Sequence, residues 1–190
     1  MGSVDTIMVT NIGSAAISAV SLVDSLNILI INVFVAMATG GAIICAQYLG
    51  SNQKDKANQA LKQLIFSVTL ISILITIPCI VFRRPLLTLI FGSVEKSVMD
   101  NSLSYLYITA LSYPFIALYN AAAASFRTSQ NSILPMAIAF GSNILNIVGN
   151  IFFIFTLSLG VAGAAISTLL SRIVSALIIL ILLKQPKQDL

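Results

Sequence analysis

A carboxylate in an apolar stretch near the start of the chain is the first group that could do chemistry. Asp5 lies within residues 4–9 (VDTIMV), in a chain with only 6 acidic residues. A charge at the centre of a bilayer costs about 2.5–3.5 kcal/mol on insertion scales, and intramembrane ionisable residues are functional by default. Asp5 is therefore a candidate to bind a proton or a small cation. The alternative is that Asp5 lies at the water interface near a helix end and is merely solvated.

Polar side chains recur at helical spacing in two later apolar segments. Asn143, Asn146 and Asn150 share one helix face, because their offsets are three and seven residues. Thr168 and Arg172 are four residues apart in the next segment and also share a face. Interhelical hydrogen bonds, worth about 0.6 kcal/mol each on average, are the alternative explanation for the asparagines. Three on one face, with a carboxylate available elsewhere, favour a polar cavity.

Further polar residues in the apolar segments could line the same cavity. Arg172 stands close to the middle of its segment, so it needs a carboxylate, carbonyl groups or a water-filled cavity. Asp24 lies near the external end of an earlier segment, where a solvated carboxylate at a cavity rim is the favoured interpretation. The possible cavity residues are Asp24, Asn27, Asn143 and Arg172.

The ligand chemistry of these residues suits a hard cation. Amide and hydroxyl oxygens with one carboxylate carry a single negative charge, which matches Na⁺ better than a divalent ion. A carboxylate taken out of water could bind a proton instead, and the sequence leaves H⁺ and Na⁺ both open. The chain contains 0 His and no paired carboxylates at helical spacing. We therefore expect no enzyme, no cofactor, and no metal site beyond Na⁺ at Asp5.

The composition is that of a membrane protein. Of 190 residues, 58% are hydrophobic and 8% are charged, whereas a soluble domain carries about 25% charged residues. Several apolar runs reach the roughly 20 residues that a helix needs to cross a bilayer. The sequence predicts an all-α polytopic bundle in a single transmembrane lobe, residues 1–190. We expect the end of a first helix over 1–12 and five full transmembrane helices over 15–48, 62–82, 98–124, 133–156 and 161–183.

The positions of the basic residues predict an orientation. The net charge is +4, and one set of alternate loops and helix ends holds Lys54, Lys56, Lys62, Arg127, Lys184 and Lys187. The opposite side holds Arg83, Arg84 and Lys96. The positive-inside rule makes the first side cytoplasmic, which predicts a multi-pass protein of the cytoplasmic (inner or plasma) membrane. No basic stripe extends beyond the short loops, so we expect no nucleic-acid partner.

Four segments carry a family resemblance. Residues 4–9 (VDTIMV) resemble the first-helix signature of the multidrug and toxic compound extrusion (MATE) transporters, and residues 46–50 (AQYLG) resemble the end of their second helix. Residues 145–152 (LNIVGNIF) are similar to the fifth helix, and residues 160–168 (GVAGAAIST) to the turn into the sixth. The resemblance covers essentially the whole chain in the right order and spacing.

The resemblance implies a fold, an activity and a site. The family fold has two six-helix lobes that rock to give alternating access, and this chain is similar to the amino-terminal lobe, without most of its first helix. The implied activity is export of amphipathic or cationic drugs in exchange for H⁺ or Na⁺. The implied partners are the bilayer, a small organic substrate, and a missing second lobe or second copy. The family's cation site maps onto Asp5, Asn146, Asn150 and Thr168.

One departure and two alternatives stay open at this point. Some relatives carry an aspartate where this chain has Asn150, so Asp5 would carry the coupling charge largely alone. A lipid-linked sugar flippase of the same superfamily is the first alternative, although Arg172 is the only mid-membrane cation available for a phosphate headgroup. A membrane assembly subunit with no transport of its own is the second.

Overall fold

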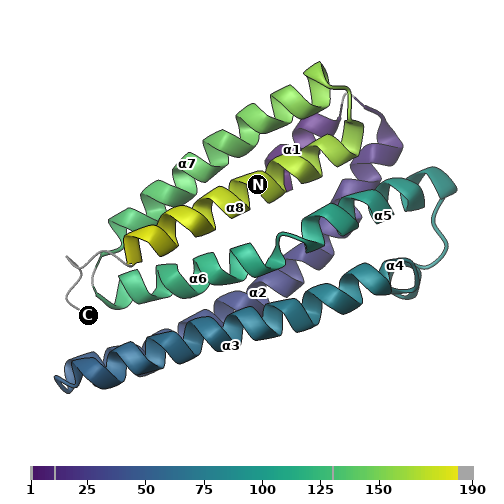
Figure 1. Cartoon of the computed structure of the whole chain (residues 1–190). Helices are drawn as coiled ribbons and strands as arrows, with labels where there is room; N and C mark the ends of the chain where they lie inside the picture. The colour runs from purple at the N-terminus through teal and green to yellow at the C-terminus, as the bar shows by residue number, and fades with distance from the viewer. Residues whose placement is uncertain (1, 11, 130, 184–190) are drawn as a thin grey trace.

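The computed structural model describes residues 2–10, 12–129 and 131–183, and every regular element in these ranges is a helix (Figure 1). The elements are α1 (Gly2–Val9), α2 (Ser14–Gly50), α3 (Lys54–Val81), α4 (Arg83–Phe91), α5 (Lys96–Ala110), α6 (Tyr113–Thr128), α7 (Ile133–Asn150), the π-helix η1 (Ile151–Thr156) and α8 (Gly160–Leu183).

The long helices are apolar enough to cross a membrane, which confirms the predicted all-α polytopic fold. Among the described residues, α2, α3, α7 with η1, and α8 each qualify as a span, and the pair α5 and α6 qualifies as a fifth, bent span. Helix α2 has 37 residues, and at about 1.5 Å per residue it is roughly 55 Å long. It therefore exceeds the hydrocarbon core of about 30 Å.

The helix predicted over 98–124 is instead two helices. Helices α5 and α6 meet at an angle of 44°, and the break falls at residues 111–112, just before Pro114. Proline has no backbone N–H to donate and clashes with the preceding turn, so it breaks a continuous helix. Pro114 lies instead in the first turn of α6, where the missing N–H would have no helical acceptor.

The predicted start of the helix over 62–82 also differs from the observed one. Helix α3 begins at Lys54 rather than at residue 62, because the polar segment before the apolar core continues the same helix. It passes through Pro78 and ends soon afterwards at Val81. Residues 86–91, which follow that end, are mostly apolar and belong to α4, a short helix in which Leu87 is buried and Leu89 is exposed.

Small residues bring α8 against α7 and η1. An added Cβ at Gly163 would lie 2.9 Å from the backbone carbonyl of Phe153 in η1, and an added Cβ at Gly149 would clash with the Ser167 hydroxyl. The predicted helix 133–156 changes to π-helical geometry at Ile151, directly after Asn150. Such π-helical turns are rare and often occur at functional sites.

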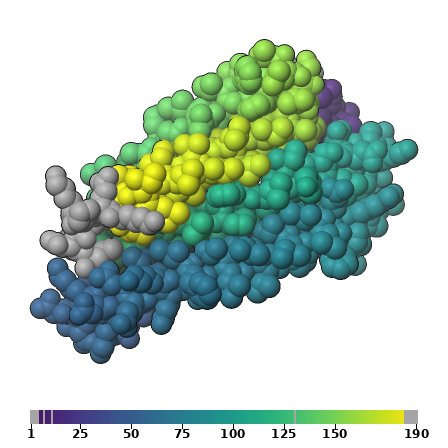
Figure 2. Space-filling model, in the orientation of Figure 1, coloured from purple at the N-terminus to yellow at the C-terminus, as the bar shows by residue number. Residues whose placement is uncertain are grey.

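The helices alternate in direction, which sorts the connections to two ends of the bundle. The α2–α3 and α6–α7 connections and the end of α8 lie at one end, and the α3–α4–α5 connections and the turn before α8 lie at the other (Figure 1). Helix α8 lies between α6 and α7 on the face seen in Figure 2. Those members of the two predicted basic sets that the structure describes fall at opposite ends. Lys184 and Lys187 lie outside the described residues.

Candidate functional site

The carboxylate of Asp5 is buried where α1 meets α7 and α8. Its side chain is 1% exposed. The Asn150 amide nitrogen donates to Asp5 Oδ1 at 2.6 Å, and the Thr168 hydroxyl donates to Asp5 Oδ2 at 2.8 Å. Asp5 thus connects three segments that are distant in the sequence.

Asn146 extends this network by one helical turn along α7. Its amide nitrogen donates to Thr168 Oγ1 at 3.1 Å and to Ser167 Oγ at 3.4 Å. The Ser167 hydroxyl returns a hydrogen bond to the Asn146 backbone carbonyl at 2.7 Å. The predicted set Asp5, Asn146, Asn150 and Thr168 therefore comes together in one hydrogen-bonded cluster.

Two amide oxygens in this cluster are left without partners. Asn146 Oδ1 and Asn150 Oδ1 are buried and accept no hydrogen bond in the described part of the chain. Leaving a buried acceptor unsatisfied costs about 1–3 kcal/mol. Carboxylate, amide and hydroxyl oxygens are the ligand types that suit a hard cation, but in this arrangement the amide nitrogens of Asn146 and Asn150, and not their oxygens, face Thr168 and Asp5.

Sequence reasoning missed Tyr105, which bridges two acidic residues. Tyr105 on α5 is 1% exposed, and its hydroxyl lies 3.4 Å from Asp5 Oδ2 and 3.2 Å from Asp24 Oδ1. A phenol has one hydrogen to donate, so it can satisfy only one carboxylate at a time. A buried tyrosine usually needs a polar partner, but nothing in the local pattern around Tyr105 indicates which one.

Asp24 and Asn27 continue the polar chain along α2. The Asn27 amide donates to Asp24 Oδ1 at 3.3 Å, and the Tyr113 hydroxyl donates to Asn27 Oδ1 at 2.7 Å. Asp24 is half-buried, and its Oδ2 is buried without a partner in the described residues. This carboxylate therefore takes part in an internal network, where the sequence favoured a solvated or rim position.

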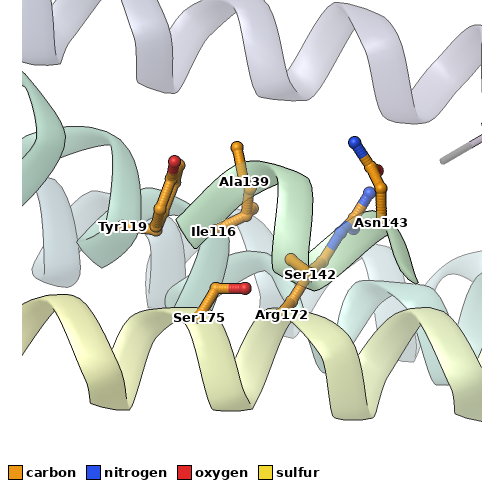
Figure 3. Close-up of a pocket in the computed structure, with 7 residues that line it drawn as sticks. All are labelled: Ile116, Tyr119, Ala139, Ser142, Asn143, Arg172 and Ser175. Atoms are coloured by element: carbon orange, nitrogen blue, oxygen red, sulfur yellow. The ribbon is translucent and has the colours of Figure 1, made fainter. Parts of the chain in front are cut away.

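Arg172 and Asn143 lie apart from the Asp5 cluster. Arg172 is 7% exposed and donates from Nη1 to the Ser112 hydroxyl at 2.7 Å, at the break between α5 and α6. Asn143 is exposed, although it shares a face of α7 with Asn146 and Asn150. Both Arg172 and Asn143 line a pocket between α6, α7 and α8 (Figure 3).

The fold and the polar interior define a class of protein: a multi-pass helical membrane protein with a polar cluster buried between its helices. The family model MatE matches residues 1–152. The chain belongs to the MatE family of transporters and corresponds to the amino-terminal lobe, which confirms the resemblance noted above. Proteins of this family are transporters, and the chain is not an enzyme.

Individual relatives agree with this assignment. The chain is 30% identical to the uncharacterized transporter YisQ of Bacillus subtilis over 97% of its own length and 41% of the relative. It is 25% identical to the multidrug export protein MepA of Staphylococcus haemolyticus over 93% of the chain and 39% of that protein. A crystal structure of MATE in the bent conformation superposes with a TM-score of 0.94 at 24% identity, covering 100% of this chain and 42% of that one. The chain thus spans about two fifths of the length of these relatives.

Proposed function

We propose that the chain forms the amino-terminal lobe of a cation-coupled antiporter that exports amphipathic or cationic compounds across the cytoplasmic membrane. The observation that carries this proposal is the buried Asp5 carboxylate, whose hydrogen-bond donors Asn150, Thr168 and Tyr105 are all neutral. A buried carboxylate with neutral neighbours is stabilised by binding a cation or a proton, because either one cancels its charge. The name of the MepA relative, a multidrug export protein, supports export of drugs as the activity.

We base the proposed coupling step on the contacts of Asp5. Na⁺ would bind to the Asp5 carboxylate with the Asn146 and Asn150 amides turned so that their free oxygens, in place of their nitrogens, face the ion, whereas H⁺ would neutralise Asp5 directly. Either ion cancels the charge that holds the short helix α1 against Asn150 and Thr168. Helix α1 then repacks, which biases the lobe toward release of substrate outside. Entry of one positive charge down 100 mV supplies about 2.3 kcal/mol.

The second lobe must come from outside the described residues. The chain covers 41% of YisQ and 42% of the matched MATE structure, and a substrate path between two lobes needs both. The partner is either a complementary lobe or a second copy of this chain.

Replacement of Asp5 tests the proposal. Asp5→Asn in the intact transporter, reconstituted in vesicles, should abolish efflux of a fluorescent organic cation driven by an imposed Na⁺ or pH gradient, because the neutral amide cannot carry the coupling charge. Comparing the two gradients identifies the ion. The matched control is Asp100→Asn, which neutralises an exposed carboxylate on α5 and should leave efflux unchanged. Ion-driven efflux that persists in Asp5→Asn would contradict the proposal.

A further inference from the structure

We propose that Arg172 and Asn143 form an anion-binding subsite that takes a carboxylate or phosphate group of an amphipathic molecule. This inference rests on the proposed transport function and narrows its substrate class. Arg172 is a buried guanidinium with no ion-pair partner among the described residues, and export of purely cationic compounds would not supply one. An amphipathic molecule that also bears one oxyanion would supply that partner.

The pocket has the size of a single functional group. Its volume is about 110 Å³, and it is lined by Ile116, Tyr119, Ala139, Ser142, Asn143, Arg172 and Ser175. A liquid water molecule occupies about 30 Å³, and pockets for whole drug-sized ligands measure about 300–1,000 Å³. The space therefore fits one polar group of a larger molecule and not the entire molecule.

Arg172 is the principal donor in this pocket. One of its nitrogens is used by Ser112, and its Nε is buried with no partner in the described residues. In Figure 3 the guanidinium extends from α8 toward the Asn143 side chain on α7. A guanidinium presents its donors in a planar fork, which matches the two oxygens of a carboxylate or phosphate.

The hydroxyl groups of the pocket are already committed as donors. Ser142 and Ser175 both donate to the backbone carbonyl of Ser171, at 3.1 Å and 2.6 Å. Tyr119 donates to the carbonyl of Pro135 at 2.8 Å. Recognition of an anion thus falls to Arg172 and to the exposed amide of Asn143.

No acidic side chain of the described residues forms an ion pair with Arg172. The carboxylates that face it from α1 and α2 are Asp5 and Asp24. Both Asp5 oxygens and Asp24 Oδ1 accept hydrogen bonds from neutral groups, whereas Asp24 Oδ2 has no partner among the described residues. A buried charge without a partner is costly. An external anion would offset this cost without disturbing the Asp5 cluster.

The subsite and the Asp5 cluster are separate but adjacent. Thr168, which donates to Asp5, lies one helical turn before Arg172 on α8. A bound oxyanion would therefore sit one turn from the coupling ion and make different contacts. This separation allows the two sites to be tested independently.

A matched pair of dyes tests the subsite. The probes are a xanthylium dye with a free carboxylate and the methyl ester of the same dye, which lacks the anion. Binding to the purified full-length transporter in detergent is followed by fluorescence anisotropy. Arg172→Gln should weaken binding of the carboxylate dye about tenfold and change binding of the ester by less than about twofold, because only the former loses a charge-assisted pair. Arg172→Lys, which keeps the charge without the fork, should give an intermediate loss.

Controls separate this role from a structural one. Arg84→Gln removes an exposed positive charge on α4 and should affect neither dye, and thermal unfolding verifies that each variant is folded. Equal losses for both dyes in Arg172→Gln, or no loss for the carboxylate dye, would overturn the subsite.

A phosphate probe distinguishes the source of the anion. Soluble short-chain phosphatidic acid should displace the carboxylate dye if a lipid headgroup can occupy the subsite, and should fail to do so if only carboxylate compounds can. If neither dye binds the unaltered transporter, the proposed substrate class is wrong. In that case the unfolding temperature tests the subsite. A rise with phosphatidic acid in the unaltered protein but not in Arg172→Gln supports the subsite, and any other result overturns it.

Discussion

At the scale of single residues, the hydrogen-bond donors around the Asp5 carboxylate are neutral. Asn150 and Thr168 satisfy its oxygens through short hydrogen bonds, but neither cancels its charge. Tyr105 stands at a longer distance and shares its one hydrogen with Asp24. The carboxylate is thus held in place by neutral donors and has no ion-pair partner among the described residues. A group proposed to bind and release an ion is expected to have such surroundings.

Removal of the Tyr105 hydroxyl should weaken coupling without abolishing it. Tyr105→Phe deletes one bridging hydrogen bond, worth about 0.5–1.5 kcal/mol, while Asn150 and Thr168 still hold Asp5. We expect the ion-driven efflux rate to fall about two- to tenfold, with a shifted Na⁺ concentration or pH at half-maximal rate, measured in reconstituted vesicles. Tyr107→Phe, which alters an exposed tyrosine of the same helix, is the control. Equal effects of the two substitutions would argue against a role for the bridge.

At the scale of elements, the close packing of α8 against α7 and η1 determines the geometry of the Asp5 cluster. Gly149 and Gly163 let α8 approach α7 and η1 at backbone distance, and this approach puts Thr168 beside Asn146. The π-helical turn that follows Asn150 lies against the start of α8. The Asp5 cluster therefore depends on small residues that take no part in its hydrogen bonds.

Addition of a single methyl group at this contact should destabilise the lobe. Gly163→Ala places a Cβ 2.9 Å from the Phe153 carbonyl, and backbone atoms cannot move aside as a flexible side chain can. We expect a loss of about 1–3 kcal/mol, typical of overpacking, seen as a lower unfolding temperature by circular dichroism in detergent. Gly141→Ala, whose added Cβ meets nothing within 4 Å, should be neutral or slightly stabilising, because alanine favours helices. A Gly163→Ala protein as stable as Gly141→Ala would refute the packing argument.

The whole molecule is a lobe with an apolar outer surface. Large side chains such as Phe66, Leu89 and Ile133 are 69%, 85% and 76% exposed. Apolar surface of this extent requires lipid or another protein surface to cover it. Since the chain spans about two fifths of its relatives, the bilayer and a second lobe are the two expected neighbours.

The proposed orientation is testable on intact cells. Lys56 and Arg84 are exposed and belong to opposite ends of the bundle. Cysteine introduced by Arg84→Cys should react with a membrane-impermeant maleimide added outside, whereas Lys56→Cys should react only after permeabilisation, as the positive-inside rule requires. The native Cys45 and Cys79 are buried, so the unaltered protein serves as the background control. The reverse labelling pattern would contradict the proposed orientation.

The helical periodicity of apolar and polar residues was enough to predict the fold class and the helix faces that carry polar side chains. Apolar runs of helical length specify the all-α membrane fold, and the four-residue spacing of Asn146 and Asn150 places both side chains on one face, because an α-helix turns every 3.6 residues. The family motifs also follow the chain in order. These features depend on near neighbours in the sequence, so no tertiary information is needed to find them.

Only the tertiary structure decided which of these residues meet. Asp5 contacts Thr168 across 163 positions and Tyr105 across 100, and such contacts depend on how whole helices pack. Packing also places Arg172 in a separate pocket, although it shares a helix face with Thr168, and leaves Asn143 outside the Asp5 cluster despite its spacing. Periodicity specifies the face on which a side chain lies, but the bend before Pro114 and the close approach of α8 to α7 determine what that face touches.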